Sequence, residues 1–552
     1  MFRRVVRSLV AVLVVASLWA GPAAGIGAAS SSTDPSIVEL LPNPVAPEDA
    51  GEYVRIRVPA GNWTVDDDES TVTVRVTSAE TLLLTSHPES IVDVPPGRVV
   101  ADGLSLSNAG ERVVLRRGGS NGTVVDSVTY GRAPEGERWL SETDPPWRPV
   151  GFEPRDPVSL GRVDTTAFVL PDDPATPLEP IDQAQERILL AGYTFASERV
   201  TRGLVAANDR GVTVRVLVDG APVGGISTRQ ARLLDRLVAA DIEVRVVAGP
   251  HARVRYHHAK YVVADETAVV LTENWKPSGV GGASSRGWGV TLRSPRAADG
   301  VATVFETDAG WRDARLWSTF RAGRSFTETE TTTGEYPSRH PAVDAEATDV
   351  TLLTAPGNAE AGVVSVVDDA DRRVDVIQPT VRPGPLLVST RRAAERGVQV
   401  RLLLSGAWYV VDENEALVAT LNRWSDQQGV PFEARVADPA GRYGKIHAKG
   451  VVADDVAVVG SLNWNPTSAT ENREVVVAVE SETVAEYYRE VFEGDWTADG
   501  GADGTGAVPP LLGAVAVAAA AAVVVLGWRR IEFDDTVGRS SDGDGDDRGP
   551  IG

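Results

Sequence analysis

The sequence predicts a multidomain α/β protein in which two similar halves form one pseudo-twofold unit, preceded by an all-β sandwich and followed by a membrane-spanning helix. Three observations predict this architecture. A segment pattern returns at an offset near 190 residues, short alternating strands fill the N-terminal region, and an uninterrupted apolar run lies near the C-terminus. At 552 residues the chain is long enough for three or four such units.

The composition is acidic and almost free of lysine. Asp and Glu outnumber basic residues 77 to 54, which gives a formal charge of −23. An acidic surface repels polyanions at long range, so a nonspecific DNA-binding protein is not expected. Only four lysines occur, all in or beside two short segments (Lys260, Lys276, Lys445 and Lys449). This balance resembles that of proteins from extremely salt-loving archaea. The absence of cysteine excludes disulfides and thiolate chemistry.

The first 29 residues have the form of a signal peptide. Arg3, Arg4 and Arg7 precede an apolar stretch over residues 9–20, and small residues follow it. A basic start, a short apolar core and a small-residue cleavage region are typical of exported proteins.

The apolar run over residues 511–528 is just long enough to cross a membrane. Arg529 and Arg530 follow it, and positive residues stay on the cytoplasmic side. We therefore expect a single-pass protein of the cell membrane with an extracellular catalytic region, a flexible linker over 497–510 and an acidic cytoplasmic tail over 529–552. A buried core helix is the alternative for the apolar run.

Residues 35–150 are predicted to form the β-sandwich. Short Val/Leu/Ile runs separated by turn residues cover 52–58, 70–76, 103–107, 111–116 and 123–129. The segments 52–56, 104–111 and 126–131 resemble a lamin-tail domain, which implies an immunoglobulin-like sandwich. Since no catalytic constellation occurs here, an adhesion or spacer role with a surface ligand is expected.

The repeat defines two αβ halves, residues 166–322 and 348–496, joined by a Thr/Glu-rich linker over 323–347. Residues 186–191 are echoed by 372–377, and residues 211–218 by 397–404. Apolar runs that follow helices ending in Arg-Gly are typical of strands buried in a sheet that helices cover.

Each half carries the same polar motif. His258, Lys260 and Asp265 in the first half match His447, Lys449 and Asp454 in the second, with the spacing His-x-Lys followed by four residues and Asp. Nine residues after each Asp stands an Asn, and a hydroxyl residue lies two positions before it (Asn274 with Thr272, and Asn463 with Ser461).

This set of residues suits phosphodiester chemistry. His and Lys at positions i and i+2 of a strand point to one face, so two facing halves supply two imidazoles and two ammonium groups. One imidazole can attack phosphorus while the other protonates the departing alkoxide. The lysines, asparagines and hydroxyls can bind phosphate oxygens without a metal. Asp265, Asp454 or Glu474 is expected to orient a histidine.

The paired motifs resemble the HKD motifs of the phospholipase D superfamily over residues 166–496. The resemblance implies a metal-independent and cofactor-independent enzyme that works as a monomer through a covalent phosphohistidine. It also implies either hydrolysis or transfer to an alcohol, with His258 as nucleophile and His447 as general acid.

The first half departs from this pattern. Where the second half has Gly460-Ser461-Leu462-Asn463 and later Glu474, the first has Leu271-Thr272-Glu273-Asn274 and later Arg286-Gly287-Trp288-Gly289. A counterpart of Glu474 is therefore missing, and nothing in the sequence accounts for the orientation of one histidine.

Phospholipid is the favoured substrate, because the predicted anchor would hold the site at a membrane face. Basic residues before each motif are expected to form a local basic mouth that recruits a phosphate (Arg253, Arg255, Arg442 and Lys445). An exported nuclease of the same superfamily and a catalytically silent surface-binding protein are the alternatives. A continuous basic groove would favour nucleic acid, and an apolar rim would favour lipid.

Overall fold

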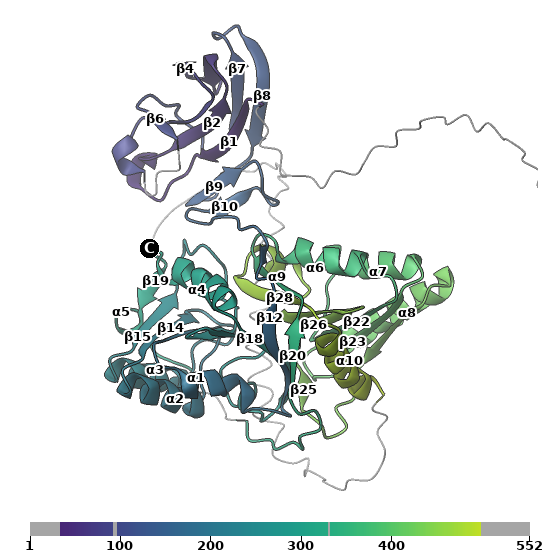
Figure 1. Ribbon diagram of the computed structural model, residues 1–552. Helices are drawn as coiled ribbons and strands as arrows, with labels where there is room; N and C mark the ends of the chain where they lie inside the picture. Colours follow the sequence, from purple (N-terminus) through teal and green to yellow (C-terminus); the bar gives the residue numbers. More distant parts are fainter. Residues whose placement is uncertain (1–33, 92–96, 329–331, 498–552) are drawn as a thin grey trace, which may run out of the picture. The chain divides into compact units, whose positions relative to one another are not determined.

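The computed structural model describes residues 34–91, 97–328 and 332–497 (Figure 1). The chain divides after Ala133 into two compact units. The expected signal peptide and the apolar run 511–528 lie outside the described residues. Within the described part of the chain, no helix has both the length and the apolar character needed to cross a bilayer.

The first unit is β-rich, as expected, and contains two sheets. One has the strand order β1 (Ser36–Leu41), β2 (Tyr53–Val58), β5 (Glu80–Leu84), β6 (Arg98–Val100). The other has the order β4 (Thr71–Val76), β3 (Gly61–Asp66), β7 (Glu111–Arg117), β8 (Thr123–Tyr130). Short 3-10 turns cover η1 (Pro47–Asp49) and η2 (Pro88–Ser90). Alternate side chains such as Val72, Val74 and Val76 are buried, which explains the alternating pattern in the sequence.

The strand expected at residues 103–107 is wrong. This segment is extended and buries Leu104 and Leu106, but its amides bind side chains and not a neighbouring strand. The Leu106 amide donates to the Glu52 carboxylate at 3.0 Å, and the Ser107 amide donates to Glu111 at 2.9 Å. Alternating hydrophobicity reports burial of one face, and it does not report which acceptor the backbone finds.

The second unit opens with the hairpin β9 (Glu137–Leu140) and β10 (Trp147–Pro149), followed by two α/β halves. The first half has the sheet order β19 (Ala314–Leu316), β15 (Glu243–Val247), β14 (Thr213–Asp219), β13 (Arg187–Gly192), β16 (Tyr261–Ala264), β17 (Thr267–Leu271), β18 (Ser285–Arg293), β12 (Val163–Leu170), β20 (Val343–Ala347). Its helical elements are η3 (Thr176–Leu178), α1 (Glu179–Gln183), α2 (Glu198–Asp209), α3 (Thr228–Ala239), α4 (Pro295–Ala309) and α5 (Trp317–Phe320).

The second half repeats this topology. Its sheet runs β24 (Phe432–Val436), β23 (Gln399–Leu404), β22 (Arg373–Gln378), β26 (Gly450–Ala453), β27 (Val456–Gly460), β28 (Glu474–Glu480), β21 (Asp349–Ala355), β11 (Val158–Ser159). Its helices are α6 (Ala359–Asp368), α7 (Pro385–Glu395), α8 (Val411–Gln428), α9 (Pro466–Thr470) and α10 (Glu482–Trp496). In the first half β13, β14 and β15 are parallel, and in the second half β22, β23 and β24 are parallel. The strand that follows each His-x-Lys motif, β16 or β26, pairs antiparallel with β13 or β22.

Local sequence explains where several of these helices begin and end. Ser197 caps α2 by accepting a hydrogen bond from the Val200 amide, and Ser227 caps α3 in the same way. Gly429 ends α8 in a left-handed conformation, with φ of 66°. The expected linker over 323–347 is partly structured, because its last five residues form the edge strand β20, which pairs with β12.

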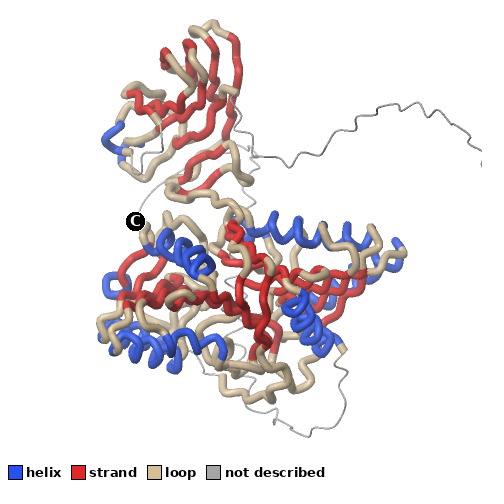
Figure 2. The backbone as a smooth tube through the Cα atoms, in the orientation of Figure 1, coloured by secondary structure: helices blue, strands red, loops and turns tan. Residues whose placement is uncertain are grey.

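The apolar core of this unit consists of three clusters, packed between the sheets and the helices that cover them (the helices and strands are drawn in Figures 1 and 2). A central cluster takes side chains from both sheets and from α4 and α10, including Phe305 and Phe492. Two outer clusters pack α1 to α3 on the first sheet and α6 to α8 on the second. Because each sheet is covered on both faces, its strands are almost wholly apolar, as expected for buried parallel strands.

The two halves exchange short backbone pairings next to the motifs. The strand β25 (Lys445–Ile446) of the second half pairs with the start of β18 in the first. In the opposite direction, His257 of the first half bridges Arg473 of the second. Each motif therefore enters the other half just before its histidine.

Candidate active site

The two predicted histidines lie at equivalent places between the halves. The His258 amide donates to the Arg473 carbonyl at 3.0 Å, and the His447 amide donates to the Arg286 carbonyl at 2.9 Å. Each histidine is thus fixed by the backbone of the opposite half. This arrangement brings the two motifs into one site, as the repeat predicted.

His258 is held by a buried carboxylate. Its Nδ1 lies 2.9 and 3.0 Å from the two carboxylate oxygens of Glu474, which is fully buried. Ser468 and Asn472 also donate to Glu474, so the carboxylate is itself fixed. The Tyr193 ring packs edge-on against the imidazole at 4.8 Å. Because Nδ1 faces Glu474, Nε2 is the nitrogen left for chemistry.

His447 also has a carboxylate neighbour, which corrects the expectation that the first half lacks one. Its Nδ1 lies 3.2 Å from Oε1 of Glu273, a residue that is 1% exposed. This contact is an ion pair without hydrogen-bond geometry, and neither atom has a hydrogen-bond partner among the described residues. The sequence did contain a signal, because Glu273 replaces the apolar residue of the second motif at a position flanked by site residues.

The two lysines lie beside the histidines of their own motifs. Lys260 Nζ donates to the His258 carbonyl, and Lys449 Nζ donates to the His447 carbonyl at 2.6 Å. Both lysines are almost fully buried. This repeated contact follows from the i and i+2 spacing, which sets both side chains on one face of an extended segment.

The site holds more positive than negative charge. Burial lowers the pKa of His258 to about 4, with further lowering by Lys260 and Lys449 and opposition from Glu474. Burial also lowers the pKa of His447 well below its ordinary value, and the charge of Lys449 adds to this effect. The charge of Lys449 lowers the pKa of His258, and the charge of Lys260 lowers the pKa of His447. The charged groups of the two motifs are therefore close enough to interact electrostatically.

The pKa values of the lysines and glutamates of the site are also shifted. Burial lowers the pKa of Lys449 to about 8 and that of Lys260 well below its usual range. Burial raises the pKa of Glu273 to about 7 against the opposing charge of Lys449. Burial works to raise the pKa of Glu474, but its pairing with His258 holds the value below its ordinary range. An anion placed among these cations would relieve their mutual repulsion.

The predicted phosphate-binding residues lie around the motifs with different roles. Thr272 and Ser461 are buried, and each hydroxyl accepts a hydrogen bond from a backbone amide of the next strand (Trp288 at 3.0 Å and Val475 at 3.1 Å). These hydrogen bonds therefore join adjacent segments of each sheet next to the site. Asn274 accepts from the Thr194 amide at 3.3 Å, whereas Asn463 is only partly buried.

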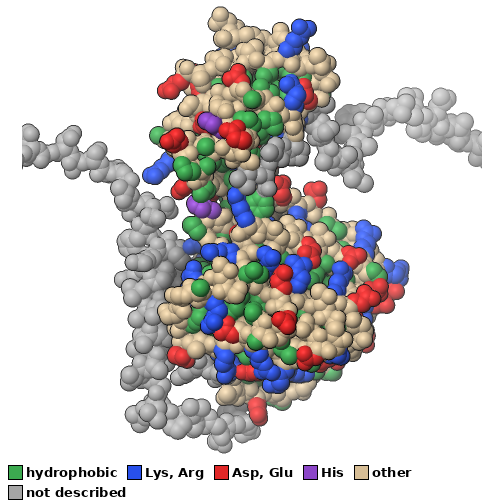
Figure 3. Space-filling model, turned by 90° about the vertical axis from the view of Figure 1, so that its left-hand side faces the viewer, with side chains coloured by type: hydrophobic (Ala, Val, Ile, Leu, Met, Phe, Trp, Pro, Cys, Tyr) green, Lys and Arg blue, Asp and Glu red, His purple; other side chains and the backbone are tan. Residues whose placement is uncertain are grey.

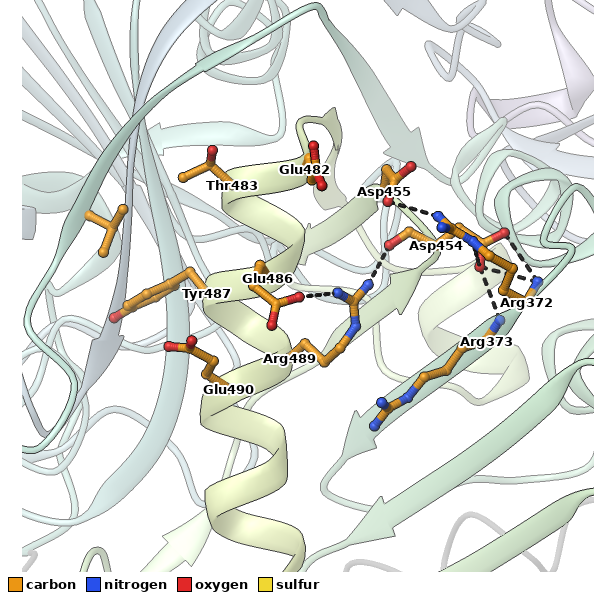
Figure 4. Close-up of a pocket in the computed structure, with 11 residues that line it drawn as sticks. Arg372, Arg373, Asp454, Asp455, Glu482, Thr483, Glu486, Tyr487, Arg489 and Glu490 are labelled. Atoms are coloured by element: carbon orange, nitrogen blue, oxygen red, sulfur yellow. Dashed lines mark hydrogen bonds and ion pairs between the residues drawn. The ribbon is translucent and has the colours of Figure 1, made fainter.

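Asp265 and Asp454 bind backbone amides of their own halves, so the expectation that one of them orients a histidine is not met. Asp265 accepts hydrogen bonds from the amides of residues 185–187 at 2.8 to 2.9 Å. Asp454 does the same for residues 371–373, at the edge of a separate pocket beside α10 (Figure 4). At about 3.3 Å per residue, the strand carries Asp265 roughly 16 Å from Lys260.

His257, next to His258 in the chain, belongs to a buried network beside the site. Its Nε2 lies 3.2 Å from Asp308, which also accepts a hydrogen bond from Arg473 of the other half at 3.1 Å. The His257 amide donates to Asp219 at 2.6 Å. This network joins the two halves.

The expected basic mouth is largely wrong. Arg253 is buried against Asp313 at 2.7 Å, and Arg255 pairs with Glu471 at 2.8 Å. Arg442 donates to backbone carbonyls. Two of the three arginines that precede the motifs, Arg253 and Arg255, are therefore paired with carboxylates.

An apolar and aromatic rim lies near the site. Lys445 Nζ donates to the Tyr409 hydroxyl at 3.2 Å, and Trp408 stacks edge-on against Tyr409. Trp408 is 63% exposed and Tyr409 43% exposed. In the first half the loop after β14 exposes 58% of Val223, whose amide donates to the hydroxyl of Tyr193 at 2.6 Å. The two loops follow equivalent strands, β14 and β23.

The surface of the α/β unit is otherwise mixed in charge. In the view of Figure 3, basic and acidic side chains are interspersed over this unit. Among the residues that the structure describes, no group of three or more His, Asp or Glu side chains is arranged to hold a metal ion.

Comparison with known proteins identifies the two halves. A family model described as "Cardiolipin synthase, PLD-like domain" matches residues 178–309 and again residues 363–496. Cardiolipin synthase B of Salmonella typhi is 26% identical over 336 residues, which are 57% of this chain and 76% of the relative. Cardiolipin synthase B of Escherichia coli K12 is 26% identical over 343 residues, with 58% and 76% covered.

Among solved structures, the chain is similar to phosphatidylserine synthase of Haemophilus influenzae, with a TM-score of 0.46 and 14% identity over 60% of this chain and 86% of that chain. Nuc from Salmonella typhimurium, a phospholipase D family member, has a TM-score of 0.25 and 19% identity over 29% of this chain and 98% of that chain. The two stretches that match the family model lie one in each half of the α/β unit.

Proposed function

We propose that this protein cleaves the phosphodiester bond of phospholipid headgroups through a covalent phosphohistidine, and passes the phosphatidyl group to water or to an alcohol. The observation that carries this proposal is the shared site of His258, Lys260, His447 and Lys449, with Glu474 beside one histidine and Glu273 beside the other. A phosphodiester anion supplies the negative charge that this site lacks.

In the first step, Nε2 of His258 attacks phosphorus and the bond from phosphorus to the leaving alcohol breaks. The low pKa of His258 leaves its imidazole neutral and able to attack, and Glu474 stabilises the positive charge that then develops on the ring. His447 gives the proton from its Nε2 to the departing alkoxide. The bound anion raises the pKa of His447, which allows it to carry that proton.

In the second step, water or an alcohol attacks phosphorus, and His447 takes the proton of the attacking hydroxyl. The bond between phosphorus and Nε2 of His258 breaks, which restores the free enzyme. Lys260 and Lys449 stabilise the phosphate oxygens in both steps, because their ammonium groups bind the backbone carbonyls of the two histidines and so lie within the site.

The rim supports a lipid substrate. Trp408 and Tyr409 are exposed next to Lys445, and such amphipathic rings favour the headgroup region of a bilayer. The curated relatives of the chain are cardiolipin synthases. The arginines that were expected to form a basic mouth are paired with carboxylates or carbonyls, which leaves less support for a nucleic-acid groove.

We also propose, from the sequence alone, that residues 1–29 direct export and that residues 511–528 anchor the protein in the cell membrane. The catalytic region would then be extracellular. The N-terminal β-rich unit, with its resemblance to lamin-tail domains, would act as a spacer or bind a surface ligand.

The test is to assay the full chain in high salt with a chelator, giving it phospholipid vesicles with added glycerol and, in parallel, single-stranded DNA. His258→Ala and His447→Ala serve as inactive controls. Headgroup release or transfer that both variants lose supports the proposal. Cleavage of DNA alone would identify a nuclease, and turnover of neither substrate would favour a silent binding protein.

A further inference from the structure

The backbone register shows that Gly287 stands where the second half has Glu474. Each follows the residue whose carbonyl accepts the amide hydrogen of the opposite histidine, Arg286 for His447 and Arg473 for His258. Each also precedes the residue that pairs with the hydroxyl residue of the neighbouring strand. A carboxylate at position 287 would therefore point at His447 as Glu474 points at His258.

When the two halves are aligned in this way, Glu273 occupies the position that Leu462 has in the second half. Leu462 is buried in the apolar core of the second half, whereas Glu273 turns its carboxylate to His447. The second half thus combines Leu462 with Glu474, and the first combines Glu273 with Gly287.

The Glu273 side chain fills the space that a side chain at position 287 would need. A Cβ atom built on Gly287 would lie 2.2 Å from Cγ of Glu273 and 2.7 Å from its Oε1. Gly287 does not have a positive φ angle, so its backbone conformation does not require glycine. The close approach of Glu273 is what requires it.

We propose that Glu273 is the positioning residue for His447 and that it has taken over this task from the position of Gly287. Oε1 of Glu273 and Nδ1 of His447 lie 3.2 Å apart, both are buried, and neither has another partner among the described residues.

The inference builds on the proposed function, since it assigns a role within the same site. A carboxylate at Nδ1 holds the proton on that nitrogen and leaves Nε2 to exchange protons with the leaving and attacking groups. Lys276 and Lys445 also face Glu273, so the carboxylate partly offsets the cations around His447 as well.

The decisive experiment replaces the Glu273 and Gly287 pair of the first half with the Leu and Glu pair that the second half has at the equivalent positions. Glu273→Leu should lower kcat about 10- to 100-fold on a soluble diester such as bis(p-nitrophenyl) phosphate. The double variant Glu273→Leu/Gly287→Glu copies the pair of the second half and should recover at least about 5-fold of that loss. Gly287→Ala alone should lower kcat, because the added methyl group displaces Glu273. Thermal unfolding verifies that each variant is folded.

A second measurement does not depend on turnover. With 15N-labelled histidine in the full chain, Glu273→Gln should change the balance of protonation between Nδ1 and Nε2 of His447 and leave His258 unchanged. An unaltered His447 signal, or a folded double variant no more active than Glu273→Leu, overturns the inference. If the wild type cleaves no diester, the proposed function fails, while the nitrogen signals still decide the role of Glu273.

Discussion

The environments of the two histidines differ more than their backbones do. His258 and His447 each donate a backbone hydrogen bond to the opposite half, at 3.0 and 2.9 Å. Yet the carboxylate at His258 comes from that paired segment, whereas the one at His447 comes from the adjacent segment after β17.

The two halves therefore both place a carboxylate next to the histidine, but they take it from different positions of the repeated sequence. Two strands of each sheet approach the imidazole, and a carboxylate on either can reach Nδ1 when the other position is small or apolar. Ser468 and Asn472 donate hydrogen bonds to the carboxylate of Glu474, whereas Oε1 of Glu273 accepts no hydrogen bond from the described residues. His258 is therefore the more rigid of the two, which suits a nucleophile that must stay aligned with phosphorus.

Replacing either histidine should have the largest effect. We expect His258→Ala and His447→Ala each to lower kcat by more than about 1,000-fold, since one removes the proposed nucleophile and the other the proposed proton donor. The comparison is sharpened by trapping. With a diester whose leaving group needs no protonation, phosphoenzyme should accumulate in His447→Ala and be absent in His258→Ala. Labelled protein found only in His258→Ala would reverse the two roles. The exposed His251 provides a control, His251→Ala, that should keep full activity.

Removing the rigid carboxylate should be the next largest change. Glu474→Gln is expected to lower kcat by about 100-fold or more, and by more than Glu273→Gln, because Glu474 makes two contacts with its histidine. Steady-state kinetics of both variants on the same soluble diester measure the difference. Equal losses would show that the tighter geometry at His258 has no catalytic value.

The pH dependence should report Lys449. Its pKa of about 8 means that the free enzyme loses this ammonium charge as the pH rises through that value, so kcat/KM should fall about tenfold per pH unit above it. Bound phosphate raises the pKa of the lysine, so the fall in kcat should begin at higher pH. A profile of kcat/KM that stays flat to pH 10 would contradict this assignment. In Lys449→Arg, which keeps its charge, the remaining activity should lose this limb.

The two rim loops should differ in their effect on lipid surfaces. Trp408→Ala is expected to reduce turnover of phospholipid vesicles about 3- to 10-fold and to leave the soluble diester unaffected, because the exposed ring contacts the bilayer and not the phosphate. Val223→Ser in the other half provides the matched control with a smaller apolar loss. An equal reduction on both substrates would place Trp408 in the catalytic pocket.

The paired aspartates should affect stability more than chemistry. Asp454→Asn keeps the left-handed turn, at φ of 48°, but weakens the hydrogen bonds to three backbone amides. We expect a loss of about 1 to 2 kcal/mol in the free energy of unfolding, with kcat within about 3-fold of the wild type. Denaturant unfolding and a diester assay measure the two quantities. A loss of activity in a variant of unchanged stability would return Asp454 to the catalytic set.

The sequence by itself determined the two α/β halves and the pairing of their motifs, because strand periodicity and a repeat of His and Lys are local properties. Spacing i and i+2 already sets His258 and Lys260 on one face, whatever surrounds them. The role of the aspartates was misjudged because spacing along a strand also sets distance, and Asp265 lies beyond the strand's far end.

Only the tertiary structure decided which groups of distant segments meet. Glu474 reaches His258, a residue 216 positions away, because the halves exchange backbone pairings beside the site. Glu273 was visible as an unusual residue in an otherwise apolar position, but its partner depended on the space that Gly287 leaves. Burial also shifts the pKa values of both histidines, and burial is a property of the packed halves that no single segment encodes.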